Sequence, residues 1–158
     1  MDVGCYPVSL IRLIAGQEPV VAHCTGELGR KSGVDLWAAG VLRFPNGIVA
    51  TFNSGMEVNT DWTATIFGQD GKIHLPSPWV PGEKDGALHV TRYGTGKTTV
   101  LRVPAKHIFA NEADVVARCL ATRRVQAPEM SWADTLGNMA TLDRLRQSMG
   151  LRWPGEAR

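Results

Sequence analysis

The chain has 158 residues, 44% of them hydrophobic and 20% charged, which is the composition of an ordinary soluble globular domain. Its 17 basic and 15 acidic residues leave a net charge of +2, so the charge gives no reason to expect binding to nucleic acid or to a membrane surface. No apolar run is long enough to cross a bilayer, and the first residues lack the pattern of a signal peptide. We therefore expect a single domain over residues 1–158, soluble and cytoplasmic.

The cysteines and histidines form no recognisable ligand or disulfide pattern. Cys5, Cys24 and Cys119 are odd in number and far apart, which favours small buried thiols in a reducing compartment over a disulfide framework. The four histidines have no zinc-ligand spacing with these cysteines, and we predict no metal site; they are His23, His74, His89 and His107.

The N-terminal segment predicts a helix. Residues 4–15 carry apolar side chains at close to helical spacing, and Gly16 is suited to end the helix. Pro7 is compatible with the first helical turn. Asp2 is then expected at or near the N-cap, where its carboxylate can accept backbone N–H bonds.

The middle of the chain predicts three β-hairpins, in which turn residues separate β-prone stretches. The paired stretches are 34–44 with 48–53, 62–67 with 72–75, and 87–93 with 98–103. Residues 20–24 are a candidate edge strand, and the proline-rich residues 76–82 are expected to form a surface loop. Successive hairpins predict a mainly antiparallel sheet.

The last third of the chain predicts helices. Amphipathic patterns cover residues 108–120 and 139–149. Ser131, followed three residues later by Asp134, resembles a capping box at the start of the final helix, and Gly150 marks its end. The fold class predicted from these elements is α+β, with an open, mainly antiparallel β-sheet and helices packed on one face.

Both faces of the predicted strand at residues 34–44 are rich in apolar side chains. One face, suited to packing under the helices, carries Leu36, Ala38, Leu42 and Phe44. The opposite face carries Asp35, Trp37, Ala39, Val41 and Arg43. Because one helical layer covers one side of a sheet, we predict that the second face meets a partner or another domain.

The sequence lacks both glycine-containing motifs that commonly bind nucleotides, so we expect no nucleotide site within this chain. The stretch 93–98 resembles a phosphate-binding loop, but Thr91 stands where that motif needs its first glycine, and a β-prone stretch follows instead of a helix. We therefore interpret it as a hairpin turn. No G-x-G-x-x-G follows a predicted strand, so the sequence has no dinucleotide-binding fingerprint. No G-x-S-x-G motif supports a serine hydrolase.

One polar pair remains as a candidate reaction centre. Asp2 and Tyr6 are four residues apart, so at a helix start they lie on the same side. A carboxylate and a phenol in this arrangement can orient and protonate a substrate hydroxyl or carbonyl. From spacing alone, helix capping and packing remain the alternative roles.

The order of several short segments resembles a known family. Residues 2–7, 10–13 and 16–19 resemble the start of the C-terminal domain of the Gfo/Idh/MocA oxidoreductases, in particular the branch of dimeric dihydrodiol dehydrogenase and glucose–fructose oxidoreductase. Further similar segments lie in the same order along the chain, at residues 33–35, 44–47, 68–73, 111–112 and 148–150.

The resemblance implies a division of labour between two domains. Members of this family place an NAD(P)-binding Rossmann domain, which holds a catalytic lysine, before the matching segment. Neither is present in this sequence. The chain is therefore expected to be the C-terminal substrate-binding and oligomerisation domain of an NAD(P)-dependent oxidoreductase that acts on a sugar, polyol or cyclic diol. Alone, we expect it to bind no nicotinamide cofactor and to lack catalytic activity.

The resemblance also assigns roles to individual residues. Asp2 and Tyr6 match the family's aspartate and its acid/base position, and Trp79 and Phe109 are placed in the substrate pocket. The open sheet face is expected to form a homo-oligomer. The alternative function is a stand-alone, non-catalytic binding or oligomerisation module derived from the same family.

Overall fold

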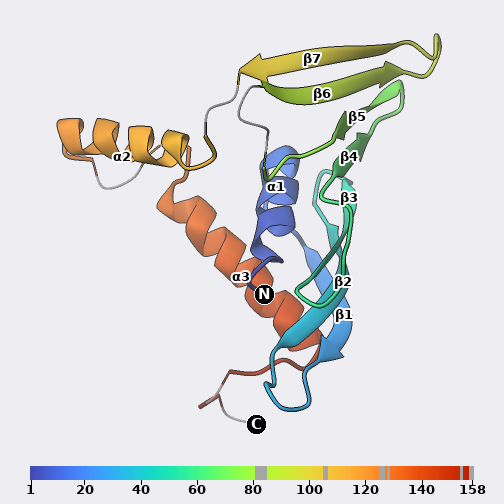
Figure 1. The fold of residues 1–158 in the computed structure, drawn as a ribbon. Helices are drawn as coiled ribbons and strands as arrows, with labels where there is room; N and C mark the ends of the chain where they lie inside the picture. The colour runs from blue at the N-terminus through green and yellow to red at the C-terminus, as the bar shows by residue number, and fades with distance from the viewer. Residues whose placement is uncertain (81–84, 105–106, 125–126, 128, 154, 157–158) are drawn as a thin grey trace. The chain divides into compact units, whose positions relative to one another are not determined.

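The computed structural model describes residues 1–80, 85–104, 107–124, 127, 129–153 and 155–156. These residues form two compact units, Met1–Thr60 with Pro128–Arg158, and Asp61–Ala127. One helix comes first along the chain, the strands follow in succession, and two helices come last (Figure 1). They are α1 (Cys5–Ala15), β1 (Val21–Leu28), β2 (Asp35–Arg43), β3 (Val49–Gly55), β4 (Ala64–Phe67), β5 (Gly71–Leu75), β6 (Asp85–Arg92), β7 (Thr98–Pro104), α2 (Ala110–Thr122) and α3 (Trp132–Ser148).

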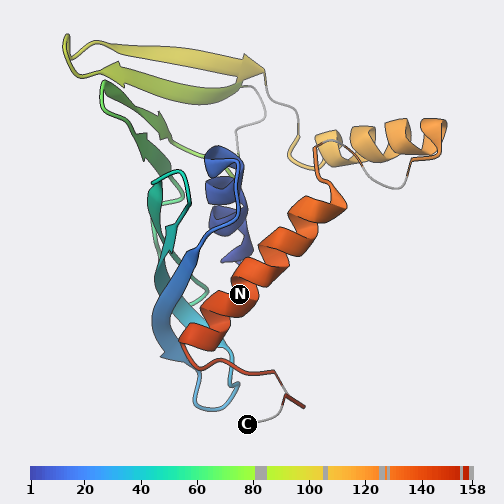
Figure 2. The ribbon, with the colours of Figure 1, turned by 180° about the vertical axis from the view of Figure 1, so that it is seen from behind.

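The first unit is a three-stranded antiparallel sheet with two helices on one face. The strand order is β1-β2-β3, and α1 and α3 lie on the same side of it (Figure 2). Helix α3 contacts β1, α1 contacts β3, and the two helices contact each other. The most deeply buried side chains lie between these layers and include Val8, Leu42, Phe44, Leu145 and Leu151.

The side chains of β2 alternate between a buried and an exposed face of the sheet. Ala38 and Leu42 are buried under the helices, as is Phe44 just after the strand, whereas Trp37, Ala39 and Arg43 are exposed on the other face. The predicted assignment of faces is thus confirmed for these residues. It follows from the two-residue period of a strand, which sends successive side chains to opposite sides.

Helix α1 begins and ends largely as its sequence predicts. Pro7 lies in the first turn, and Gly16 adopts a left-handed conformation (φ 65°) from which its N–H donates to the Arg12 carbonyl at 2.9 Å. The expected capping role of Asp2 is wrong. The N-cap is Gly4, which has no side chain, and the helix has no side-chain cap, while the Asp2 carbonyl accepts a bond from the Cys5 thiol at 3.0 Å.

Helix α3 starts with the predicted capping box. The Ser131 hydroxyl accepts a bond from the Asp134 N–H at 3.1 Å, and the Asp134 carboxylate accepts one from the Ser131 N–H at 3.2 Å. Because the Ser131 hydroxyl and N–H both donate to this carboxylate, its pKa is lowered. The box satisfies backbone donors that the first turn of a helix otherwise leaves unpaired.

The β2–β3 turn also fixes the end of α1. The Ile48 N–H donates to the side-chain oxygen of Asn46 at 3.2 Å, and Gly47 takes a φ of 87°. The Asn46 side-chain amide donates to the carbonyl of Ala15, the last residue of α1, at 3.0 Å. A single turn residue therefore shapes the hairpin and holds the helix beside it.

The second unit is a four-stranded antiparallel sheet followed by α2. Its strand order is β4-β5-β6-β7. The α+β class, the antiparallel pairing and all three hairpins are confirmed. The strands are divided between two sheets, however, and residues 56–63, which join β3 to β4, form no strand. Of the proline-rich loop predicted at 76–82, residues 81 and 82 lie outside the described residues.

The burial of the cysteines agrees in part with the sequence analysis. Cys5, Cys24 and Cys119 are free; Cys24 is 2% exposed, whereas the other two are half-buried. Burial raises the pKa of the Cys24 thiol.

In the described part of the chain, no helix combines the length and apolar character that a membrane crossing requires.

We predict that Gly26→Ala destabilises the fold. Gly26 pairs with Ala38 across β1 and β2, and a Cβ atom there would overlap the Trp37 carbonyl oxygen and lie 2.9 Å from the Ala38 Cα. These are backbone atoms, so the strands must move apart, at a cost of about 1–3 kcal/mol. Urea denaturation measures the loss.

The matched control is Gly94→Ala in the β6–β7 turn, where a Cβ atom meets nothing within 4 Å. This variant should keep the wild-type midpoint. Equal midpoints for the Gly26 variant and wild type would contradict the tight packing of β1 on β2.

Candidate active site

The two predicted catalytic side chains lie at the start of α1 in the first unit. Tyr6 is in the first helical turn and is 57% exposed. Asp2 precedes the N-cap by two residues and is also exposed. Both are accessible from outside the unit, which a role in chemistry on a small molecule requires.

The backbone that carries this pair is packed closely although its side chains are exposed. Gly4 is buried, and a Cβ atom at this position would lie 3.3 Å from the Ser54 hydroxyl on β3. On the other side, the Asn138 amide of α3 donates to the Cys5 carbonyl at 3.4 Å. The first turn of α1 is thus held against both β3 and α3.

A buried arginine fixes the rest of α1. Arg12 is 7% exposed, and its guanidinium donates to both carboxylate oxygens of Glu18, with the Nε–Oε2 distance 2.9 Å. A third bond runs from Nη1 to the Asp134 carbonyl in the first turn of α3, at 3.1 Å. Arg12 therefore joins α1, the segment after it and α3.

The Arg12–Glu18 pair depends on a glycine in the opposite helix. A Cβ atom at Gly137 would overlap both the Arg12 guanidinium and the Glu18 carboxylate. Hydrogen bonding to Arg12 lowers the pKa of Glu18, with partial burial acting in the opposite direction. The sequence analysis missed this pair. A glycine inside a predicted helix, where it weakens the helix, was the signal that could have drawn attention to it.

The two predicted substrate-pocket residues belong to the second unit. Trp79 is half-buried in the segment after β5. Phe109 is the N-cap of α2 and is 60% exposed, with its ring 5.8 Å from the His107 ring. Asp2 and Tyr6 thus share one unit and Trp79 and Phe109 share the other. All four assignments remain predictions.

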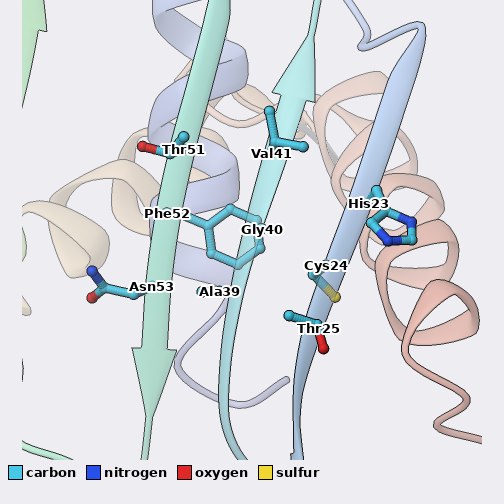
Figure 3. Close-up of a pocket in the computed structure, with 9 residues that line it drawn as sticks. All are labelled: His23, Cys24, Thr25, Ala39, Gly40, Val41, Thr51, Phe52 and Asn53. Atoms are coloured by element: carbon cyan, nitrogen blue, oxygen red, sulfur yellow. The ribbon is translucent and has the colours of Figure 1, made fainter.

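A shallow hollow lies on the outer face of the first unit, away from Asp2 and Tyr6. Figure 3 shows it at the middle of β1, β2 and β3, with the helices behind the strands. The small side chain of Ala39 lies exposed on the outer face at its centre. The lining residues are His23, Cys24, Thr25, Ala39, Gly40, Val41, Thr51, Phe52 and Asn53. The hollow is open and offers no acid/base pair for catalysis.

The described strands form no parallel βαβ unit. Every strand pair among them is antiparallel, so none has the βαβ turn that places a pyrophosphate at a helix N-terminus. In the glycine-rich stretch 93–98, residues 93–97 form the turn between β6 and β7 and Thr98 begins β7, so the predicted hairpin is confirmed. In the same part of the chain, no three His, Cys, Asp or Glu side chains gather as a metal site.

Comparison with known proteins agrees with the resemblance seen in the sequence. The family model described as the GFO/IDH/MocA C-terminal domain matches residues 1–74. D-xylose 1-dehydrogenase (NADP(+)) 2 of Haloferax volcanii is 26% identical over 148 residues, which cover 94% of this chain and 44% of that protein. Residues 1–74 are thus similar to the C-terminal domain of the GFO/IDH/MocA family.

Further relatives support the same placement. Mouse trans-1,2-dihydrobenzene-1,2-diol dehydrogenase is 25% identical, over 100% of this chain and 48% of its own length. The structure of KijD10, a 3-ketoreductase from Actinomadura kijaniata, superposes with a TM-score of 0.82 at 20% identity, over 94% of this chain and 46% of that one. The chain spans about half the length of the curated relatives it matches.

We predict that Glu18→Gln changes the pH dependence of stability. A carboxyl whose pKa is lowered in the folded state stabilises the fold above its unfolded pKa of about 4.3, and this contribution is lost as the pH falls through the lower, folded pKa. At pH 7 the variant should lose about 1 kcal/mol or less, because Glu18 is largely exposed. Urea midpoints measured from pH 7 to pH 3 check this.

The wild type should lose more stability than the variant over that range, so that their midpoints converge in acid. Asp134 and Glu156, whose pKa values are also lowered, titrate in both proteins and cancel in the difference. Glu27→Gln on the exposed side of β1 is the matched control. Parallel pH profiles for the wild type and the Glu18 variant would contradict the role of this pair.

Proposed function

We propose that the chain is the substrate-binding and oligomerisation domain of an NAD(P)-dependent oxidoreductase that acts on a sugar, polyol or cyclic diol. The observation that carries this proposal is the family match at the segment that holds Asp2 and Tyr6. Relatives that cover nearly the whole chain support it, since they include a D-xylose dehydrogenase and trans-dihydrobenzenediol dehydrogenases. Both names describe oxidation at a carbon that bears a hydroxyl group.

The proposed chemistry of this chain is proton transfer. The Tyr6 phenol exchanges a proton with the substrate hydroxyl or carbonyl, and the Asp2 carboxylate orients that group by accepting a hydrogen bond. The exposure of both side chains on a firmly held helix start supports these roles. NAD or NADP serves as the redox partner in the whole enzyme, and residues outside the described part of this chain would have to bind it.

Tyr6→Phe should abolish most activity and leave the fold intact. Because this chain covers the C-terminal half of its relatives, the assay uses a chimera in which the N-terminal half of the Haloferax volcanii relative precedes Met1. Removing a general acid–base group typically lowers turnover by about 10²–10⁴-fold. The phenyl ring remains, so the melting temperature should not change. Turnover is measured with NADP⁺ and a series of aldoses and diols.

The chain's other tyrosine supplies the matched control. Tyr93 lies at the β6–β7 turn with 48% exposure, so Tyr93→Phe removes a phenol from a comparably open position. It should leave turnover unchanged. If Tyr6→Phe instead keeps turnover within about twofold, well below the range for such groups, Tyr6 is structural and the non-catalytic module becomes the better interpretation.

The outer face of the first sheet supports the proposed oligomerisation. The helices that the structure describes in this unit, α1 and α3, both lie on the other side of the sheet (Figure 2). Val21, Trp37 and Val49 on this face are 42%, 44% and 61% exposed. Large apolar side chains exposed on one face of a sheet are typical of an interface.

We predict that Val41→Lys lowers self-association. Val41 lies at the centre of this face, between His23 on β1 and Thr51 on β3, so a lysine there would place a charged side chain in the middle of the proposed contact. An obligate interface should bury on the order of 2,000 Å² or more. Sedimentation velocity at micromolar concentrations should show an oligomer for wild type and a monomer for the variant.

Leu13→Lys is the matched control, since Leu13 is 78% exposed on α1, on the other side of the sheet. It should sediment like wild type. A wild-type chain that sediments as a monomer would contradict the proposed interface.

A further inference from the structure

Two histidines that are distant in sequence lie side by side in the second unit. His74 on β5 and His89 on β6 are directly paired in the antiparallel register, so both side chains project from the same face. Their ring centroids are 6.0 Å apart and the rings are tilted by 52°. Both residues are half-buried. The sequence spacing gave no sign of this pair, because only the strand register brings the two residues together.

We propose that His74 and His89 form a two-histidine site for one divalent transition-metal ion. Imidazole nitrogen is the ligand that Ni²⁺, Cu²⁺ and Zn²⁺ accept readily. With metal–nitrogen distances of about 2.0–2.1 Å, the ion lies about 3 Å from each ring centre, so centroids about 5–6 Å apart suit a shared ion. Water fills the remaining coordination positions.

A threonine on the neighbouring strand fixes the orientation of one ligand. Thr65 on β4 pairs with His74, and its hydroxyl oxygen lies 2.9 Å from the His74 Nδ1 atom. When Nδ1–H donates to this hydroxyl, Nε2 carries the free lone pair that a metal needs. Histidine ligands of metals almost always donate their second ring N–H in this way. The row Thr65–His74–His89 thus contains two ligands and a group that orients one of them.

The charges beside this row limit which ions can bind. Lys72 and Arg102 belong to the neighbouring rows of the same face, opposite Thr91 and Ala87 respectively. Their positive charge opposes every divalent cation, so binding must depend on the ligand atoms. Two imidazole nitrogens suit Ni²⁺, Cu²⁺ and Zn²⁺, whereas Mg²⁺ and Ca²⁺ need several oxygen ligands that this row does not offer.

Titration of the untagged 158-residue chain with NiCl₂ by calorimetry tests the site. We expect one Ni²⁺ per chain, with affinity at least about tenfold lower in His74→Ala and in His89→Ala, which each lose a ligand. Thr65→Val should lower affinity by about 10–100-fold, the usual effect of removing such a partner. His23→Ala and His107→Ala are the matched controls and should bind like wild type.

A second measurement uses the wild-type chain and so does not depend on whether a variant folds. Substoichiometric Ni²⁺, which is paramagnetic in this coordination, should broaden the NMR signals of the His74 and His89 rings before those of His23 and His107. Absence of heat up to millimolar Ni²⁺, unchanged binding in both histidine variants, or broadening centred on another histidine would each overturn the proposal. Neither Tyr6 nor the cofactor enters these measurements, so they are independent of the proposed enzymatic function.

Discussion

A single buried guanidinium holds the helical layer of the first unit together. Arg12 is almost inaccessible to solvent, and its guanidinium donates two hydrogen bonds to the Glu18 carboxylate and one to the Asp134 carbonyl. A buried charge is tolerated only when it is paired and hydrogen-bonded in this way. Because its partners belong to different segments, Arg12 specifies how α1 crosses α3, which apolar contacts alone would leave less defined.

In the sheet beneath this layer, the strands are constrained by close packing around two glycines. Gly26 and Gly40 lie on neighbouring strands at positions where a Cβ atom would meet the adjacent strand or the Cys24 and Phe52 side chains. The absence of a Cβ atom at Gly40 leaves room for the Phe52 ring on the inner side, and the hollow of Figure 3 lies at the centre of the same sheet. The same residues therefore permit a dense core on one side and a surface open to a partner on the other.

Local features were predictable from sequence, and features that depend on long-range register were not. Pro7, Gly16, Ser131 and the turn at Gly47 act through their own backbone preferences, so they marked the ends of helices and hairpins correctly. The Asp2 cap failed because Gly4 packs against β3, which sets where the helix begins. The partition into two sheets, the Arg12–Glu18 pair and the His74–His89 pair all depend on how strands and helices are placed. No local spacing encodes that placement. The spacing of Asp2 and Tyr6 suggested a polar pair, but their assigned roles and those of Trp79 and Phe109 came from the family resemblance.

The start of α1 combines a fixed backbone with exposed functional groups. This combination suits side chains that act on a molecule outside the chain. Gly4 packs on β3, the Cys5 carbonyl is bound by Asn138, and Arg12 anchors the last part of the helix. A residue retained only for packing would direct its side chain into this contact region, as Val8 does at 0% exposure. Tyr6, two residues earlier on the same helix, is instead directed outward. Catalytic groups need this arrangement, because proton transfer requires a fixed position and access to the reacting atoms.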